Sequence, residues 1–97
     1  MANPEELSLP SEIAKATEAA EVLRAWIVDS RLVCVLDPQA FEDPAIWGML
    51  LADVARHVGQ ACEQLQGADP EAVSRAIAQS FAAELAKPTD DPHGALE

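Results

Sequence analysis

This chain has few of the residues that build nucleotide-binding and catalytic sites. It has no tyrosine, two tryptophans, two phenylalanines and four glycines in 97 residues. The glycines are scattered, so the chain has no glycine-rich loop of the kind that binds a phosphate group. We therefore expect no cofactor, and we expect a core built mainly from aliphatic side chains.

Cysteine and histidine are too few and too scattered to predict a metal site. The candidate ligands are Cys34, Cys62, His57 and His93, and no two of them form a C-x-x-C or H-x-x-x-H pair. Both cysteines fall on apolar faces of predicted elements, which is typical of reduced cysteines in a core. We predict no metal ligands, and the sequence leaves a disulfide between the two cysteines open.

Basic residues are also scarce, with 6 lysines and arginines against 17 acidic residues and a net charge of -11. This excess of negative charge disfavours binding to nucleic acid and to anionic membranes. An acidic surface most often keeps a small protein soluble. Binding to a basic protein is an alternative, and such binding would weaken steeply with salt.

The sequence contains no apolar run of the ~18 residues that a membrane helix needs. Its first residues have neither the basic nor the apolar region of a signal peptide, so we expect a cytoplasmic protein. Leu96 and Glu97 resemble a cloning scar.

Residues 21–36 have the alternation expected of a two-stranded antiparallel hairpin. With a two-residue turn at 29–30, Val28 lies opposite Arg31, and the pairing continues back along both strands. The Asp-Ser turn lacks the glycine that such turns favour, so a longer loop with a shifted register is the alternative.

This register sorts the hairpin side chains onto two apolar faces. The first face consists of Leu23, Ala25, Ile27, Leu32, Cys34 and Leu36, and we expect it to pack against the stripe of a long helix. The second face has no predicted cover within the chain, and its members are our candidate interface residues: Arg24, Trp26, Val28, Arg31 and Val33. We expect the two arginines to pair with carboxylates of a partner subunit or to cover an interface rim, with an anion site beside the tryptophan as the alternative.

Two helices are predicted after the hairpin, at 43–66 and 69–87. Each begins with an Asp-Pro pair, in which the aspartate caps the first turn and the proline occupies the first helical position. Gly67 is expected to end the first helix. The apolar stripe of that helix is broad, which predicts contact with more than one element. It consists of Trp47, Leu50, Leu51, Val54, Val58, Ala61, Cys62 and Leu65, widened by Ile46 and Met49.

These elements predict a single α+β domain over residues 1–97, with two C-terminal helices packed on an antiparallel hairpin. Residues 1–20 are predicted to be an N-terminal arm or a weak helix, and residues 88–97 a disordered tail. Two strands make a poor sheet, so we expect a second subunit to complete it in a homodimer. The dimer is expected to form by pairing of strand edges or by burial of the face around Trp26.

The chain's most plausible chemical cluster is Asp53, Arg56 and His57, which share one surface of the predicted helix. A carboxylate beside an imidazole suits general acid–base chemistry, although the same spacing is typical of an ordinary surface ion pair. No nucleophile or oxyanion hole can be placed beside His57. We predict no catalytic residues, with a small enzyme or small-molecule binder at a subunit cleft as the alternative.

Residues 21–58 resemble a family of small, mostly alphaproteobacterial proteins catalogued as a domain of unknown function. The most specific stretches are Glu21–Ile27 and Asp43–Val58. The resemblance implies a free-standing bacterial domain and brings no activity with it. The expected function is that of a non-enzymatic, homodimeric protein-binding or regulatory module.

Overall fold

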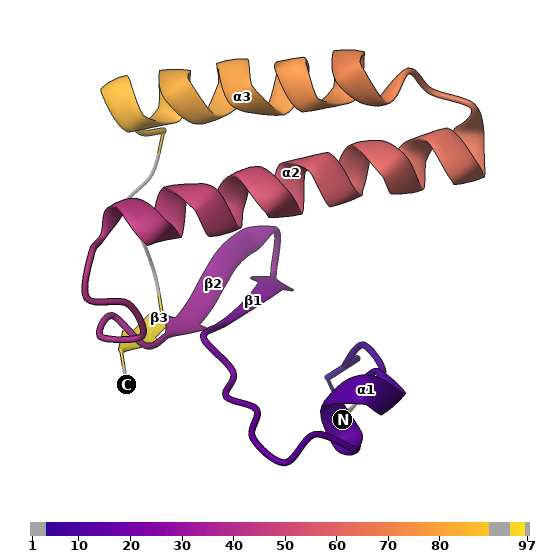
Figure 1. The fold of residues 1–97 in the computed structure, drawn as a ribbon. Helices are drawn as coiled ribbons and strands as arrows, with labels where there is room; N and C mark the ends of the chain where they lie inside the picture. The colour runs from indigo at the N-terminus through magenta and orange to yellow at the C-terminus, as the bar shows by residue number, and fades with distance from the viewer. Residues whose placement is uncertain (1–3, 90–93, 97) are drawn as a thin grey trace.

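The computed structural model describes residues 4–89 and 94–96. Strands β1 (Leu23–Val28) and β2 (Arg31–Leu36) form a hairpin. Helix α2 (Ala45–Gln66) follows the hairpin in the chain, and α3 (Pro70–Ala86) folds back and packs along α2 (Figure 1). The predicted α+β class, with a hairpin and two C-terminal helices, is confirmed.

The N-terminal arm contains one turn of helix, α1 (Ser11–Ala14), which begins after Pro10 without a side-chain cap. Leu7 and Leu9, in the segment before it, are 99% and 67% exposed. A helix this short, with Ile13 as its one large apolar residue, has little to pack against. The arm therefore adds almost nothing to the burial of apolar surface.

The predicted hairpin register is confirmed, with Leu23 opposite Leu36 and Val28 opposite Arg31. Asp29 and Ser30 form the turn with φ angles of 49° and 67°. Both angles lie in the left-handed region that type I′ hairpin turns require. Aspartate tolerates this region better than most residues, so the backbone strain falls mainly on Ser30.

Residues 94–96, which we expected to be disordered, instead form a third strand, β3 (Gly94–Leu96). This strand pairs in parallel with residues 34–36 of β2, so the sheet order is β1-β2-β3. The open edge of β2 offers N–H and C=O groups to any extended segment, whatever its side chains. Side-chain pattern therefore cannot reveal this pairing. The rest of the predicted disordered region beyond Thr89 lies outside the described residues.

Both Asp-Pro pairs stand at helix starts. Helix α3 begins at Pro70 with Asp69 as its N-cap, as predicted, whereas α2 begins one residue later than predicted, at Ala45 with Pro44 as its N-cap. An Oδ1 atom of Asp43 accepts a hydrogen bond from the Ala45 N–H at 2.9 Å, and Asp69 does the same for the Glu71 N–H at 3.2 Å. Gly67 ends α2 with a φ of 70°, in the left-handed region. The two helix starts and the end of α2 at Gly67 set the boundaries of the helices. They let the chain fold back along α2.

Helices α2 and α3 pack against each other at Gly59, which is the one buried residue of α2. A Cβ atom at this position would lie 2.8 Å from the Pro70 carbonyl oxygen and 3.1 Å from the Ser74 Oγ. The two backbones approach this closely because glycine has no side chain. Gly48, on the same helix, would place a Cβ with nothing within 4 Å.

No apolar side chain in the described part of the chain is fully buried. The molecule exposes 8603 Å², against about 5,400 Å² for an average folded monomer of this mass. Its radius of gyration is 15.4 Å, whereas a single domain of this length averages about 12.5 Å. The single chain therefore exposes roughly 3,000 Å² more surface than an average monomer of its mass.

Burial along the hairpin differs from the prediction. Ile27 and Leu32, on the face expected to be covered, are 74% and 56% exposed. Trp26 and Val33, on the opposite face, are half-buried. Burial thus separates the base of the hairpin from its tip, residues 27–32, rather than one face from the other. The base is the end that β3 and the chain after β2 adjoin.

Candidate functional site

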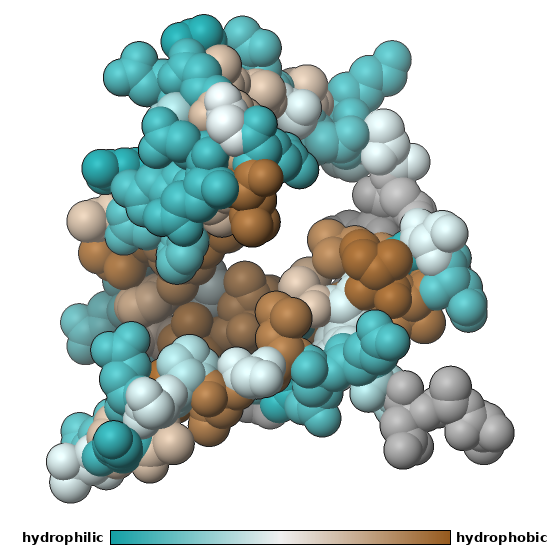
Figure 2. Space-filling model, turned by 90° about the vertical axis from the view of Figure 1, so that its right-hand side faces the viewer, coloured by the Kyte–Doolittle hydropathy of each residue, from teal (hydrophilic) through white to brown (hydrophobic). Residues whose placement is uncertain are grey.

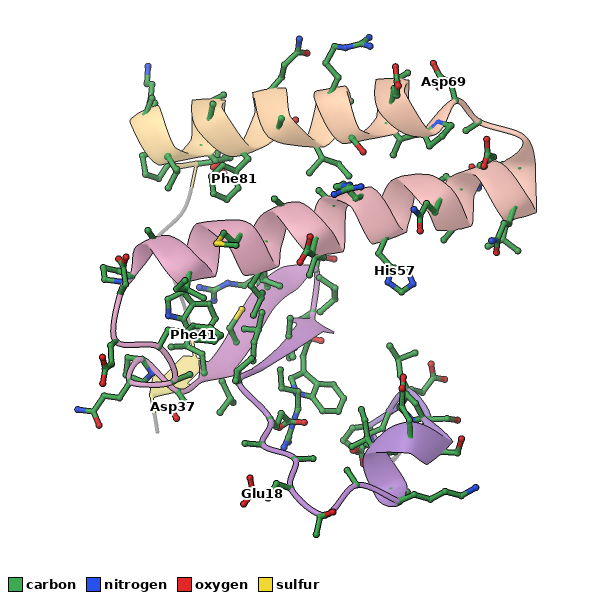
Figure 3. The ribbon with its side chains drawn as sticks, in the orientation of Figure 1. Glu18, Asp37, Phe41, His57, Asp69 and Phe81 are labelled. Carbon is green, nitrogen blue, oxygen red and sulfur yellow. The ribbon has the colours of Figure 1, made fainter. Side chains whose placement is uncertain are left out.

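One side of α2 carries an open depression of about 460 Å³. Six side chains line this surface, which we call the open side of α2: Ile46, Met49, Leu50, Asp53, Val54 and His57. They recur at steps of three and four residues, which places them on one face of the helix. His57 points away from α3, toward the side of α2 on which the hairpin lies (Figure 3).

Most of the open side is apolar and exposed. Met49 is 64% exposed, Val54 49% and Ile46 36%. Apolar residues also border an open hollow when the molecule is viewed from the end that carries the α2–α3 turn (Figure 2). The breadth of the predicted apolar stripe indicated that α2 contacts more than one element. It did not show that part of the stripe is left uncovered within the chain.

The structure brings two members of the predicted polar cluster to this surface. Asp53 and His57 both line the open side, one helical turn apart, whereas Arg56 does not line it. In the part of the chain that the structure describes, none of the three forms an ion pair with another. The two groups can accept or donate hydrogen bonds to a ligand, and no hydroxyl or thiol lines the depression beside them.

The hairpin register places the five candidate interface residues on one face, with Trp26 opposite Val33 and Val28 opposite Arg31. Trp26 and Val33 are half-buried, and Val28 is 47% exposed. The face around Trp26 is thus partly covered within a single chain. We had expected it to be uncovered from base to tip.

Arg24 has an acidic partner within its own chain. Its Nε and Nη2 atoms donate hydrogen bonds to Glu21 Oε1 at 2.9 and 2.6 Å. Both side chains are about half exposed, so the pair contributes little to stability. Within the single chain, this arginine is therefore paired with a carboxylate from three residues earlier.

The aromatic residues at the start of α2 have a packing role. Phe41 and Trp47 meet edge to face, with ring centroids 5.3 Å apart and ring planes at 78°. Both side chains are half-buried. This contact holds the chain after β2 against the first turn of α2.

The cysteines and the helices give no further site. Cys34 and Cys62 are free and half-buried. Within residues 4–89 and 94–96, no three His, Cys, Asp or Glu side chains are grouped so as to hold a metal ion. None of the described helices is both long enough and apolar enough to span a bilayer.

Comparison with curated proteins gives no match. A solved structure from the photosynthetic bacterium Rhodopseudomonas palustrus CGA009, provisionally described as a pyruvate dehydrogenase, is similar with a TM-score of 0.72. The two sequences are 36% identical, over 94% of this chain and 93% of that chain. The family model described as a domain of unknown function, DUF5076, matches residues 6–89 and so extends the resemblance at 21–58 in both directions. The chain belongs to the DUF5076 family.

Proposed function

We propose that this protein is a non-enzymatic, cytoplasmic homodimer that binds or regulates another protein. The observation that carries the proposal is that no apolar side chain is fully buried in the described part of a single chain. Obligate dimer interfaces resemble a domain core cut in half and bury about 2,000–5,000 Å² in total. The excess surface of this chain is large enough to supply one subunit's share of such an interface.

The non-enzymatic part of the proposal rests on the side chains of the open side. Asp53 and His57 stand there among four apolar residues. Covalent catalysis needs a nucleophile within hydrogen-bond reach of a base, and the lining supplies none. An apolar surface with two polar groups is better suited to binding another apolar surface.

Our proposal does not carry the pyruvate dehydrogenase description of the Rhodopseudomonas structure over to this chain. Oxidation of a keto acid requires a cofactor that accepts electrons, and glycine-rich loops commonly bind the phosphates of such cofactors. Here Gly59 closes the contact between the helices and Gly67 ends α2. Both glycines have structural roles, and the sequence has no glycine-rich run elsewhere.

Sedimentation equilibrium of the wild-type protein tests the homodimer. We expect a species of twice the 10.3 kDa chain mass at micromolar concentration. A species of one chain mass at high micromolar concentration would contradict the proposal, because the exposed apolar surface would then remain in water.

A second candidate function is small-molecule binding at the open side, favoured by the position of Asp53 and His57 at a depression. Titration with pyruvate, followed through the His57 ring resonances by NMR, tests it. A saturable shift that disappears in Asp53→Asn would favour this candidate. No shift in the wild type is the result expected of a non-enzymatic module.

A further inference from the structure

We propose that a second copy of this chain covers the open side of α2, so that the two α2 helices pack face to face about a two-fold axis. The proposal rests on the proposed homodimer and adds the surface through which it forms. This surface differs from both interfaces predicted from the sequence, namely paired strand edges and the face around Trp26.

The open side has the pattern that helix–helix packing requires. Its apolar side chains extend over a little more than two turns of α2, from Ile46 to Val54, and they line the depression. Ridges of one helix fit the grooves of another, and an identical helix supplies both. The opposite side of α2 is already closed by α3 at Gly59.

Charge also favours a second copy at this place. The chain has a net charge of -11, so two copies repel each other over most of their surface. Between Ile46 and His57, however, α2 carries one carboxylate, Asp53, and one guanidinium, Arg56. This stretch has no net charge with His57 neutral, so two copies can approach there with little repulsion.

The amount of exposed surface indicates a partner that is always present. The excess of roughly 3,000 Å² is spread over the whole chain, the N-terminal arm included, and a fraction of it would supply the half-share of a standard interface, which is about 800 Å². A second copy is available whenever the protein is made, at matching concentration. An occasional partner would leave this surface in water for most of the protein's lifetime.

Two other surfaces are weaker candidates. The outer edge of β1 is unpaired in the described sheet, but pairing there would leave Met49 and Val54 exposed. Helix α3 exposes Phe81 by 46% and Leu85 by 71%, and neither residue lines the depression on α2. These surfaces provide the controls for a test.

Thiol labelling of the intact dimer tests the proposal. We would replace Cys34 and Cys62 by alanine and introduce Met49→Cys or, as the matched control, Leu85→Cys. Met49 and Leu85 are 64% and 71% exposed in a single chain, so a monomer would label at both positions at similar rates. We expect Met49→Cys to react with a maleimide about tenfold more slowly than Leu85→Cys, and to gain reactivity on dilution below the dimer dissociation constant.

Sedimentation of the same proteins distinguishes the proposed homodimer from the proposed interface on the open side of α2. If they are dimeric and the two positions label equally, or if Leu85→Cys is the protected one, the surface proposed here is wrong while the homodimer stands. If the wild-type protein is monomeric, both proposals are wrong. Should Met49→Cys itself weaken the dimer, Val54→Cys, at a position 49% exposed, provides the same readout.

Discussion

The two sides of α2 are both apolar, yet only one is covered within the chain. Toward α3, Gly59 lets the Pro70 carbonyl and the Ser74 side chain approach until the glycine is buried. On the open side, Met49 and Val54 remain about half exposed or more. An amphipathic pattern shows that a helix face needs a partner. It does not show whether that partner belongs to the same chain.

The largest expected effect is on the open side. Met49→Asp places an unpaired carboxylate from each subunit in the proposed interface, where it loses its hydration. We expect the dimer to weaken about 100-fold, or about 2.7 kcal/mol, by sedimentation. Leu85→Asp introduces the same charge at an exposed position on α3, and we expect it to change the dissociation constant less than about threefold. Equal effects of the two substitutions would remove the distinction between these surfaces.

The covered side of α2 is tested by a pair of glycine substitutions. Gly59→Ala forces the Pro70 carbonyl away from α2 and should lower the free energy of unfolding by about 2 kcal/mol. Gly48→Ala meets open space on the same helix and should raise it by about 0.5–1 kcal/mol through helix propensity. Urea denaturation at one fixed protein concentration measures both. A stabilising Gly59→Ala would show that the two helices are less closely packed than described.

A smaller effect is expected at the hairpin turn, away from both sides of α2. Ser30→Gly relieves a φ of 67° and should stabilise the chain by about 0.5–1 kcal/mol. Ser80→Gly, on an exposed position of α3, is the matched control and should destabilise it by about 0.5 kcal/mol. If Ser30→Gly also changed the dimer dissociation constant at matched stability, the hairpin turn would belong to the interface.

The smallest expected effect is that of salt. Because the open side carries one carboxylate, Asp53, and no lysine or arginine, while the whole chain is strongly acidic, salt screens only the repulsion between the subunits. Raising the salt from about 0.1 to 1 M should tighten the dimer by no more than about threefold. A dimer that weakens steeply over this range would indicate an interface held by opposite charges, contrary to the apolar open side.

Much of the fold was predictable because local chemistry sets it. The alternation in the hairpin fixed the pairing of Leu23 with Leu36, since a slip of one residue would exchange the two faces. The Asp-Pro pairs predicted both helix starts because the carboxylate and the proline act on their own first turn. β3 was not predictable, since backbone pairing at a strand edge needs no particular side chains.

The candidate site was predictable only in part. Spacing placed Asp53 and His57 on one surface of a helix, and the structure places them on one depression. The exposure of Ile27, Leu32 and Met49 was not predictable, because it depends on how the hairpin and the helix pair are placed relative to each other. That placement is a tertiary property that strand and helix periodicity do not encode.

The central claim is that a single chain lacks a core until a second copy supplies it. The most direct test is the thermal unfolding midpoint of the wild-type protein as a function of protein concentration. If folding and dimerisation are coupled, the midpoint rises with concentration, because each tenfold increase adds about 1.4 kcal/mol to the stability of the dimer. A cooperative transition whose midpoint is the same over a hundredfold range of about 1–100 μM would contradict the account.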